Sequence, residues 1–316
     1  MTINVTVLRI GGRLVPLALA ALLGLPVLGL AQEVDRDSIV ASLKTQFPPA
    51  EVPVSIAEEL VPVDPFAAPA PFGPGEHLVY KVKVGIFGVG EGYMSVVGVA
   101  DEPEGPAYRV AMNIRGGLGP LKVNDTYQTW FDVTTLQSRR FIQDINGPGH
   151  SAYRFYDMDL DAMRWERQDN GESGDLGSAL PLDDMAFIYF VRTLPLEVGK
   201  SYTLNRYFKD TGNPVVIRVL RRDQRETEGV HYNTIVVAPE IRTTGLFGEG
   251  GEAEIHFTDD ERRLPVYVKS DLKGFPGSLT LHLRSVQEGL PLHPDSRAES
   301  AAATAVRAAA EPPPEG

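Results

Sequence analysis

The stretch HLVYKVKVGIFGVGEGYMSV, residues 77–96, decides the fold class. In its first eight residues, the apolar side chains of Leu78, Tyr80 and Val82 alternate with His77 and Lys81. A period of two needs one buried and one solvated face, which is typical of antiparallel strands. Glycines follow at positions 85, 88, 90 and 92, and a valine-rich segment comes after them. We therefore predict a strand, a glycine turn and a second strand.

The same glycines raise the question of a phosphate-binding loop. Such a loop needs a Gly-Lys-Ser/Thr sequence running into a helix, because the helix N-terminus supplies amide groups and a positive dipole to the phosphate. The stretch lacks Gly-Lys-Ser/Thr, and Glu91 stands where a phosphate needs positive charge. We interpret the segment as a β-turn whose glycines allow positive φ and a close approach of strands.

The period of two recurs along the chain. It is present in Tyr108–Ile114 and again at 279–283, where leucines alternate with polar side chains. Turn signals rich in Gly, Asn, Asp and Pro separate the alternating segments, for example at 146–149, 169–171 and 211–214. The sequence therefore predicts a mainly β fold, either a large curved antiparallel sheet or an incomplete β-barrel.

One segment, PLDDMAFIYFVRTLPLEVGK at 181–200, departs from this pattern. Asp183 or Asp184 can cap a helix, and Pro195 stops it after about ten residues. We expect one short helix from about Asp183 to Thr193, lying on or plugging the curved sheet.

The glycine turn has a second copy in the sequence. GIFGVGEGYMSV, from Gly85 to Val96, is echoed by GLFGEGGEAEIHF, from Gly245 to Phe257. The echo is consistent with two related halves of one sheet. It predicts that both segments are hairpin connections, with Phe87 and Phe247 in similar surroundings.

The first 31 residues have the features of a signal peptide. Arg9 and Arg13 precede an apolar run from Leu14 to Leu30, and small residues lead up to a cleavage position after Ala31. A transmembrane anchor is the alternative, but the run is short for one and contains two prolines. We expect export and cleavage near Ala31, leaving no integral membrane span, and a periplasmic or secreted location.

The remaining chain divides by composition into three parts. Residues 32–71 are rich in Pro, Ala, Val and acids and predict a linker, in which the composition allows one short helix near 35–45. Residues 72–290 form the expected β domain. Residues 291–316 form an Ala/Pro tail that we expect to be disordered.

Overall composition narrows the function classes. The 316 residues carry a net charge of −12 and no cysteine. The negative charge argues against nucleic-acid binding, which depends on Lys and Arg neutralising phosphates. The absence of cysteine excludes a thiol nucleophile, a disulfide and lipid attachment through a cysteine.

Three groups of acids and the six histidines are candidates for chemistry. The aspartates at 157, 159 and 161 resemble the start of a calcium loop, but Ala162 and Gln168 stand where Gly and Glu are needed, so a hairpin is favoured. Turns and helix caps explain the pairs Asp183-Asp184 and Asp259-Asp260 better than glycoside hydrolysis does. The six histidines lack paired metal-ligand spacing, and we expect them to be solvated. The sequence therefore assigns no catalytic, cofactor or metal residue and leaves ligand-binding residues unknown.

Three segments resemble the bacterial domain-of-unknown-function family 3108. They are FGPGEHLVYKVKVGIFGVG at 72–90, DDMAFIYFVRTLPLEVGK at 183–200 and TDDERRLPVYV at 258–268. The resemblance implies an exported envelope protein of undetermined biochemical role and supplies no catalytic residue. The arrangement is also similar to the lipoprotein-carrier type of half-open barrel, in which helices close a curved sheet around acyl chains.

These observations leave three functional hypotheses. The first is non-enzymatic binding of a hydrophobic or lipid-like ligand, without a cofactor. The second is a structural or protein-interaction module of the cell envelope, with an unknown protein partner. The third is an enzyme that acts on envelope polysaccharide. An empty apolar cavity inside the sheet would favour the first.

Overall fold

The computed structural model describes residues 9–10, 13–14, 36–49, 70–118, 121–147, 150–241, 253–271, 278–290 and 292. The chain divides into two compact units, Met1–Asp35 and Arg36–Gly316. In the first unit, two short strands pair in antiparallel fashion, β1 (Arg9–Ile10) and β2 (Arg13–Leu14). The other residues of the expected signal peptide lie outside the described residues.

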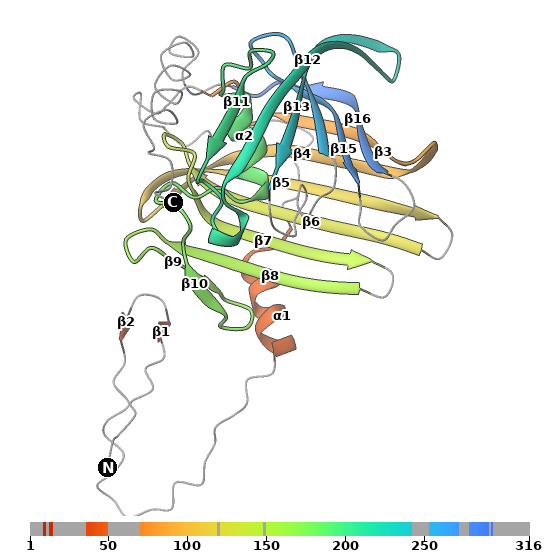
Figure 1. Ribbon diagram of the computed structural model, residues 1–316. Helices are drawn as coiled ribbons and strands as arrows, with labels where there is room; N and C mark the ends of the chain where they lie inside the picture. The colour runs from red at the N-terminus through yellow and green to blue at the C-terminus, as the bar shows by residue number, and fades with distance from the viewer. Residues whose placement is uncertain are drawn as a thin grey trace, which may run out of the picture. The chain divides into compact units, whose positions relative to one another are not determined.

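One antiparallel sheet of fourteen described strands dominates the second unit (Figure 1). The strands are β3 (His77–Val84), β4 (Phe87–Glu102), β5 (Gly105–Leu118), β6 (Leu121–Asp132), β7 (Ser138–Gly147), β8 (His150–Asp159), β9 (Arg164–Arg167), β10 (Ser173–Asp175), β11 (Ser201–Leu204), β12 (Val215–Thr227), β13 (Val230–Glu240), β14 (Ala253–Thr258), β15 (Pro265–Asp271) and β16 (Ser278–Gln287). The described helices are α1 (Arg36–Gln46), α2 (Asp184–Arg192) and the short 3-10 helix η1 (Asp210–Gly212). Neither α1 nor α2 is long and apolar enough to cross a membrane.

The strand order is β10-β9-β8-β7-β6-β5-β4-β3-β16-β15-β14-β13-β12-β11. Strands adjacent in sequence are therefore adjacent in the sheet, except β10 and β11, and the first and last strands, β3 and β16, also pair. This is an up-and-down barrel that is open between β10 and β11. We call this opening the seam; two isolated bridges, Leu176 with Lys209 and Leu182 with Tyr207, cross it. The prediction of a mainly β, incomplete barrel is confirmed.

The stretch at 77–96 forms the predicted hairpin. β3 ends at Val84 and β4 begins at Phe87, and these two residues are register partners. The turn residue Gly85 has φ +58°, a conformation that glycine adopts without strain. Ile86 and Phe87 are exposed at the tip. Phe247 and the other residues at 242–252 lie outside the described residues, so the similarity of the two turns stays a prediction.

Two glycines bring β4 and β5 unusually close together. Gly90 and Gly116 are register partners, and a Cβ atom on Gly90 would lie 2.0 Å from the backbone oxygen of Arg115. A Cβ atom on Gly116 would lie 2.3 Å from the backbone oxygen of Val89. Any side chain at either position would collide with backbone. The predicted close approach of strands therefore occurs at this pair.

The helix α2 fills the interior of the sheet, and all nine of its residues are buried. Its N-cap is Asp183, whose Oδ1 accepts hydrogen bonds from the backbone amides of Met185 and Ala186. The second carboxylate oxygen accepts from the hydroxyls of Thr129 on β6 and Ser138 on β7, each at 2.6 Å. The predicted cap therefore also ties the helix to two strands.

The C-terminal end of α2 is held by a buried ion pair. The guanidinium of Arg192 donates to both carboxylate oxygens of Glu76, at 2.6 and 2.7 Å. It also donates to the backbone oxygens of Pro71 and Arg262. These contacts join the helix to the segment before β3 and to the β14–β15 turn. We call this end of the sheet, where Glu76 and Arg192 meet, the closed end.

The helix α1 covers part of the outer face, over β5 to β8. Phe47, which follows it, packs edge-on against Trp130 and Phe155, with ring centroids 6.1 and 5.0 Å apart. Lys44 pairs with Asp144 at 2.8 Å. The helix lies where the composition allows one, and its packing against the sheet is an addition that the sequence did not predict.

Candidate functional site

The acid pairs named from sequence occupy structural positions. Asp183 caps α2, and its neighbour Asp184 accepts a hydrogen bond from the hydroxyl of Tyr207 at 3.1 Å. Asp259 and Asp260 lie between β14 and β15, where both pair with arginines of the same turn. The two pairs therefore do not meet across a cleft. Within the described part of the chain, no group of three or more His, Asp or Glu side chains could hold a metal ion.

The aspartates at 157, 159 and 161 belong to the β8–β9 hairpin. Asp157 and Asp159 end β8, and β9 begins at Arg164. The Oδ1 atom of Asp159 accepts a hydrogen bond from the backbone amide of Ala162 at 2.8 Å, which stabilises the turn. The prediction of a hairpin is confirmed, and these carboxylates have a local structural role.

The expectation of solvated histidines is wrong for His256. Its side chain is only 2% exposed, although it is on the outer face of β14. Burial, assisted by the positive charge of Arg225, lowers its pKa from 6.5 to about 4. The physical reason is that the β12–β13 hairpin folds over this face, where Arg225 lies 3.5 Å above the ring of Tyr267 and Lys81 pairs with Glu228.

Tyr267 lies between two histidines in this outer layer. Its ring makes edge-on contacts with His256 and His282, at centroid distances of 5.1 and 5.0 Å. Burial is also the main cause that lowers the pKa of His282 to about 4. Both imidazoles are thus neutral near pH 7, which suits packing under the hairpin.

The interior contains an apolar crevice of only about 20 Å³. Its lining comes from β4, β5, β15, β16 and α2: Met94, Met112, Ile114, Ile188, Val268, Ser270, Leu279 and Leu281. A volume of this size is close to that of one water molecule, whereas small-molecule pockets hold about 300–1,000 Å³. This crevice is therefore too small to hold an acyl chain without rearrangement of its lining.

A much larger concavity, of about 830 Å³, lies across the ends of β4 to β8 opposite the closed end. We call it the rim groove. It is lined by Val89, Gly90, Glu91, Arg115, Gly116, Gly117, Lys122, Val123, Asn124, Asn146, Gly147 and Ser151. Many of the lining residues are small, and the groove presents charges of both signs together with glycine backbone.

The charges of the rim groove are only partly neutralised. Glu91 pairs with Arg284 at 2.9 Å and with Arg115 at 3.7 Å, and all three side chains are half exposed or more. Lys122 is exposed and makes no ion pair with a described carboxylate. The amide of Asn124 accepts a hydrogen bond from Asn113 at 2.9 Å. The groove therefore offers charged and hydrogen-bonding groups to a partner.

Sequence reasoning did not identify this groove. Gly90 belongs to the opening stretch, but its partner Gly116 lies 26 positions later, and only the strand register brings the two together. The concentration of glycine in both segments was the one available signal.

Comparison with solved structures gives distant matches. The crystal structure of a beta-barrel-like protein of domain of unknown function DUF1849 from Brucella abortus has 12% identity and a TM-score of 0.45, covering 69% of this chain and 99% of that one. The hypothetical protein CT021 from Chlamydia trachomatis has 11% identity and a TM-score of 0.29, covering 69% and 88%. No curated protein matches the sequence.

The comparison with protein families is more informative. Residues 79–284, well over half of the chain, match the family described as "Protein of unknown function (DUF3108)". The match begins within β3 and ends within β16, and so includes nearly all of the sheet, α2 and the rim groove. The chain belongs to the DUF3108 family.

Proposed function

We propose that this protein is an exported component of the cell envelope that acts as a protein-interaction module through its rim groove. One observation carries the proposal: the rim groove is a surface concavity of about 830 Å³, whereas the apolar crevice between β4, β5, β15, β16 and α2 has a volume of about 20 Å³. Of these two, the rim groove has the space for a partner. Export to the periplasm, or secretion, rests on the signal-peptide features of residues 1–31.

The chemistry of the groove suits an extended polar segment of a protein. Gly90, Gly116 and Gly147 expose backbone that a partner can approach closely. Arg115 and Lys122 supply positive charge and Glu91 supplies negative charge, which favours a partner carrying both signs. The lining has no aromatic side chain of the kind that anchors a sugar ring or an acyl chain.

Site-specific photocrosslinking in cells tests this proposal. A photoreactive residue is placed at Lys122 or Asn124 in the groove, and at Lys200 on the exposed surface as the matched control. We expect one crosslinked partner from both groove positions and none from the control. The same adduct from Lys200, or no adduct from either groove position, would contradict the proposal.

A charge-reversal experiment gives the second test. Arg115→Glu with Lys122→Glu should abolish the crosslink made from Asn124, whereas Lys200→Glu should leave it intact.

Cell fractionation and N-terminal sequencing test export, with Gln32 as the expected first residue of the mature chain.

Binding of a lipid-like ligand is a second candidate, favoured by the apolar lining of the interior crevice. Met94 and Met112 face it, and methionine side chains repack readily because they are unbranched and flexible. A ligand there would have to displace side chains or α2. Native mass spectrometry of the purified protein tests this, with Ile188→Phe as a variant that fills the crevice. Loss of a co-purifying lipid in that variant supports the candidate, and absence of lipid from the wild type removes it.

A further inference from the structure

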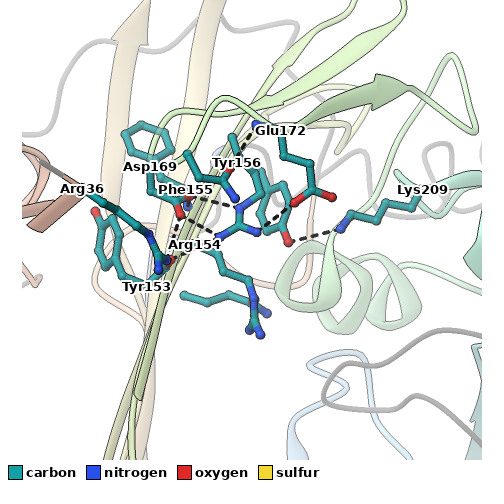
Figure 2. A network of polar contacts seen from close by, with 11 residues as sticks. Arg36, Tyr153, Arg154, Phe155, Tyr156, Asp169, Glu172 and Lys209 are labelled. Carbon is teal, nitrogen blue, oxygen red and sulfur yellow. Dashed lines mark hydrogen bonds and ion pairs between the residues drawn. The ribbon is translucent and has the colours of Figure 1, made fainter. Parts of the chain in front are cut away.

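Two cationic side chains face the interior near the seam. Arg154 lies on β8, and Lys209 lies directly before η1, where its backbone bridges to Leu176 across the seam. Figure 2 shows Arg154, Tyr156 and Lys209 on one side of the strands, while Arg36 and Tyr153 lie on the other side. Arg154 and Lys209 are both half-buried, so solvent reaches them.

Aromatic rings hold Lys209 in place. Its Nζ atom donates a hydrogen bond to the hydroxyl of Tyr156 at 3.2 Å. The same ammonium lies 4.5 Å from the ring centroid of Tyr156 and 4.7 Å from that of Trp165. The backbone bridge and the rings together fix the position of this charge before any ligand binds.

Arg154 is positioned by a row of register partners on the inner face. Tyr127, Gln143 and Arg154 lie side by side on β6, β7 and β8. The guanidinium donates to the amide oxygen of Gln143 at 3.3 Å, its one hydrogen bond with a described residue. Its other N–H groups are available to an acceptor.

The carboxylates in this region are engaged with other groups. Arg167 pairs with Asp169 at 2.6 Å and with Glu172 at 3.0 Å, as Figure 2 shows for both carboxylates. In the described part of the chain, no carboxylate lies within ion-pair distance of Arg154 or Lys209.

Lys209 lies within electrostatic range of two arginines and two carboxylates. Burial lowers its pKa, the attraction of Glu172 and Asp184 opposes this shift, and the repulsion of Arg167 and Arg154 adds to it. An anion bound between Arg154 and Lys209 would offset the burial and the repulsion.

We propose that Arg154 and Lys209 form a binding site for a phosphate-type oxyanion. The planar guanidinium can donate two parallel hydrogen bonds to phosphate oxygens, and the ammonium adds a point charge. Two cations match the charge of about −2 that a phosphomonoester carries. The site lies near the seam and is separate from the rim groove, so it goes beyond the proposed function. Inorganic phosphate and the head group of a phosphatidic acid share this chemistry.

Calorimetric titration of the full mature chain tests the site. The probes are inorganic phosphate and dihexanoyl phosphatidic acid below its micelle concentration, with dihexanoylglycerol as the uncharged counterpart. We expect saturable binding that weakens roughly tenfold in Arg154→Gln or Lys209→Gln, the effect of losing one charge-assisted contact, and disappears in the double variant. Arg164→Gln is the matched control, because Arg164 is exposed on neighbouring β9 and pairs with exposed Asp175.

The variants also separate binding from folding. Without phosphate, Arg154→Gln should unfold at the same temperature as the wild type or higher, because it removes repulsion. Lys209→Arg keeps the charge and should retain phosphate binding.

The comparison of probes identifies the source of the phosphate. Equal affinity for phosphate and phosphatidic acid indicates a free anion, and tighter phosphatidic acid binding with no dihexanoylglycerol binding indicates a lipid head group. The proposal is overturned if neither phosphate compound binds saturably, or if the double variant binds like the wild type.

Discussion

The closed end and the rim groove lie at opposite ends of the sheet, and they differ in the burial, charge and size of their side chains. At the closed end, Arg192 and Glu76 are almost fully buried and are joined by two short hydrogen bonds. At the rim, glycines leave backbone bare and charges face solvent. The difference indicates that one end fixes the fold, while the other presents groups for contact.

The largest effect should come from breaking the ion pair at the closed end. Glu76→Gln leaves the buried Arg192 without a counter-charge, which should lower the free energy of unfolding by about 3–5 kcal/mol. Urea denaturation measures this. The double variant Glu76→Gln/Arg192→Met should lose less than the sum of the two single losses. A loss below about 1 kcal/mol in Glu76→Gln would remove the contrast between the ends.

A second prediction tests whether every position of the rim groove tolerates substitution. Gly90→Ala places a Cβ atom 2.0 Å from the backbone oxygen of Arg115 and should cost about 1–3 kcal/mol of stability. Gly98→Ala is the matched control on the same strand, because a Cβ atom there meets nothing within 4 Å. Thermal unfolding of both variants measures this difference in stability. Equal stability of the two would mean that β4 and β5 separate easily at the rim.

Acid should loosen the outer layer over β14 to β16. The pKa of His256 is lowered from 6.5 to about 4, so the unfolded chain binds its proton first. The stability that this histidine contributes is complete above pH 6.5 and is lost as the pH falls toward 4. Near pH 5 the loss that His256 causes should be about 2 kcal/mol relative to pH 7.5, and His282, whose pKa is also lowered to about 4, adds to it.

Urea denaturation at both pH values measures that loss, and substitution assigns it. His256→Gln should remove about half of the pH dependence, because His282 has a similarly lowered pKa, whereas His231→Gln should leave it unchanged, because His231 is 78% exposed. An unchanged slope in His256→Gln would show that His256 is not the group responsible.

The smallest effect is expected at the hairpin tip between β3 and β4. Ile86 is 87% exposed and Phe87 is 61% exposed, so Ile86→Ser and Phe87→Ser should change stability by no more than about 0.5 kcal/mol. Differential scanning calorimetry is sensitive enough to test this. A loss above about 1 kcal/mol would show that the tip packs against other residues and is not free for contact.

Local patterns in the sequence predicted the elements of this fold well. The alternation at Leu78, Tyr80 and Val82 marks a strand because one face is buried, and all three side chains are in the core. The helix could be placed because Asp183 and Pro195 are local start and stop signals. The alternation of a strand and the capping of a helix depend on residues that are close in sequence, so both can be recognised in the sequence itself.

Features that depend on long-range pairing could not be predicted in this way. His256 is buried because a distant hairpin covers it, and nothing near position 256 signals that cover. Gly90 meets Gly116 through the strand register, and Arg154 and Lys209 are 55 positions apart. The rim groove and the proposed phosphate site therefore arise from contacts between segments that are far apart in the sequence.

The pairing of β3 with β16 has a consequence for how the connectivity of the chain could be changed. Gln287 and His77 are register partners, so the two ends of the sheet segment lie side by side. A circular permutant that links these ends and starts the chain between β10 and α2 would keep every strand pair of the fourteen-stranded sheet. Its new termini would lie at the seam, and the strands would follow one another in the chain in the same order as across the sheet, from β11 to β10, in one continuous run.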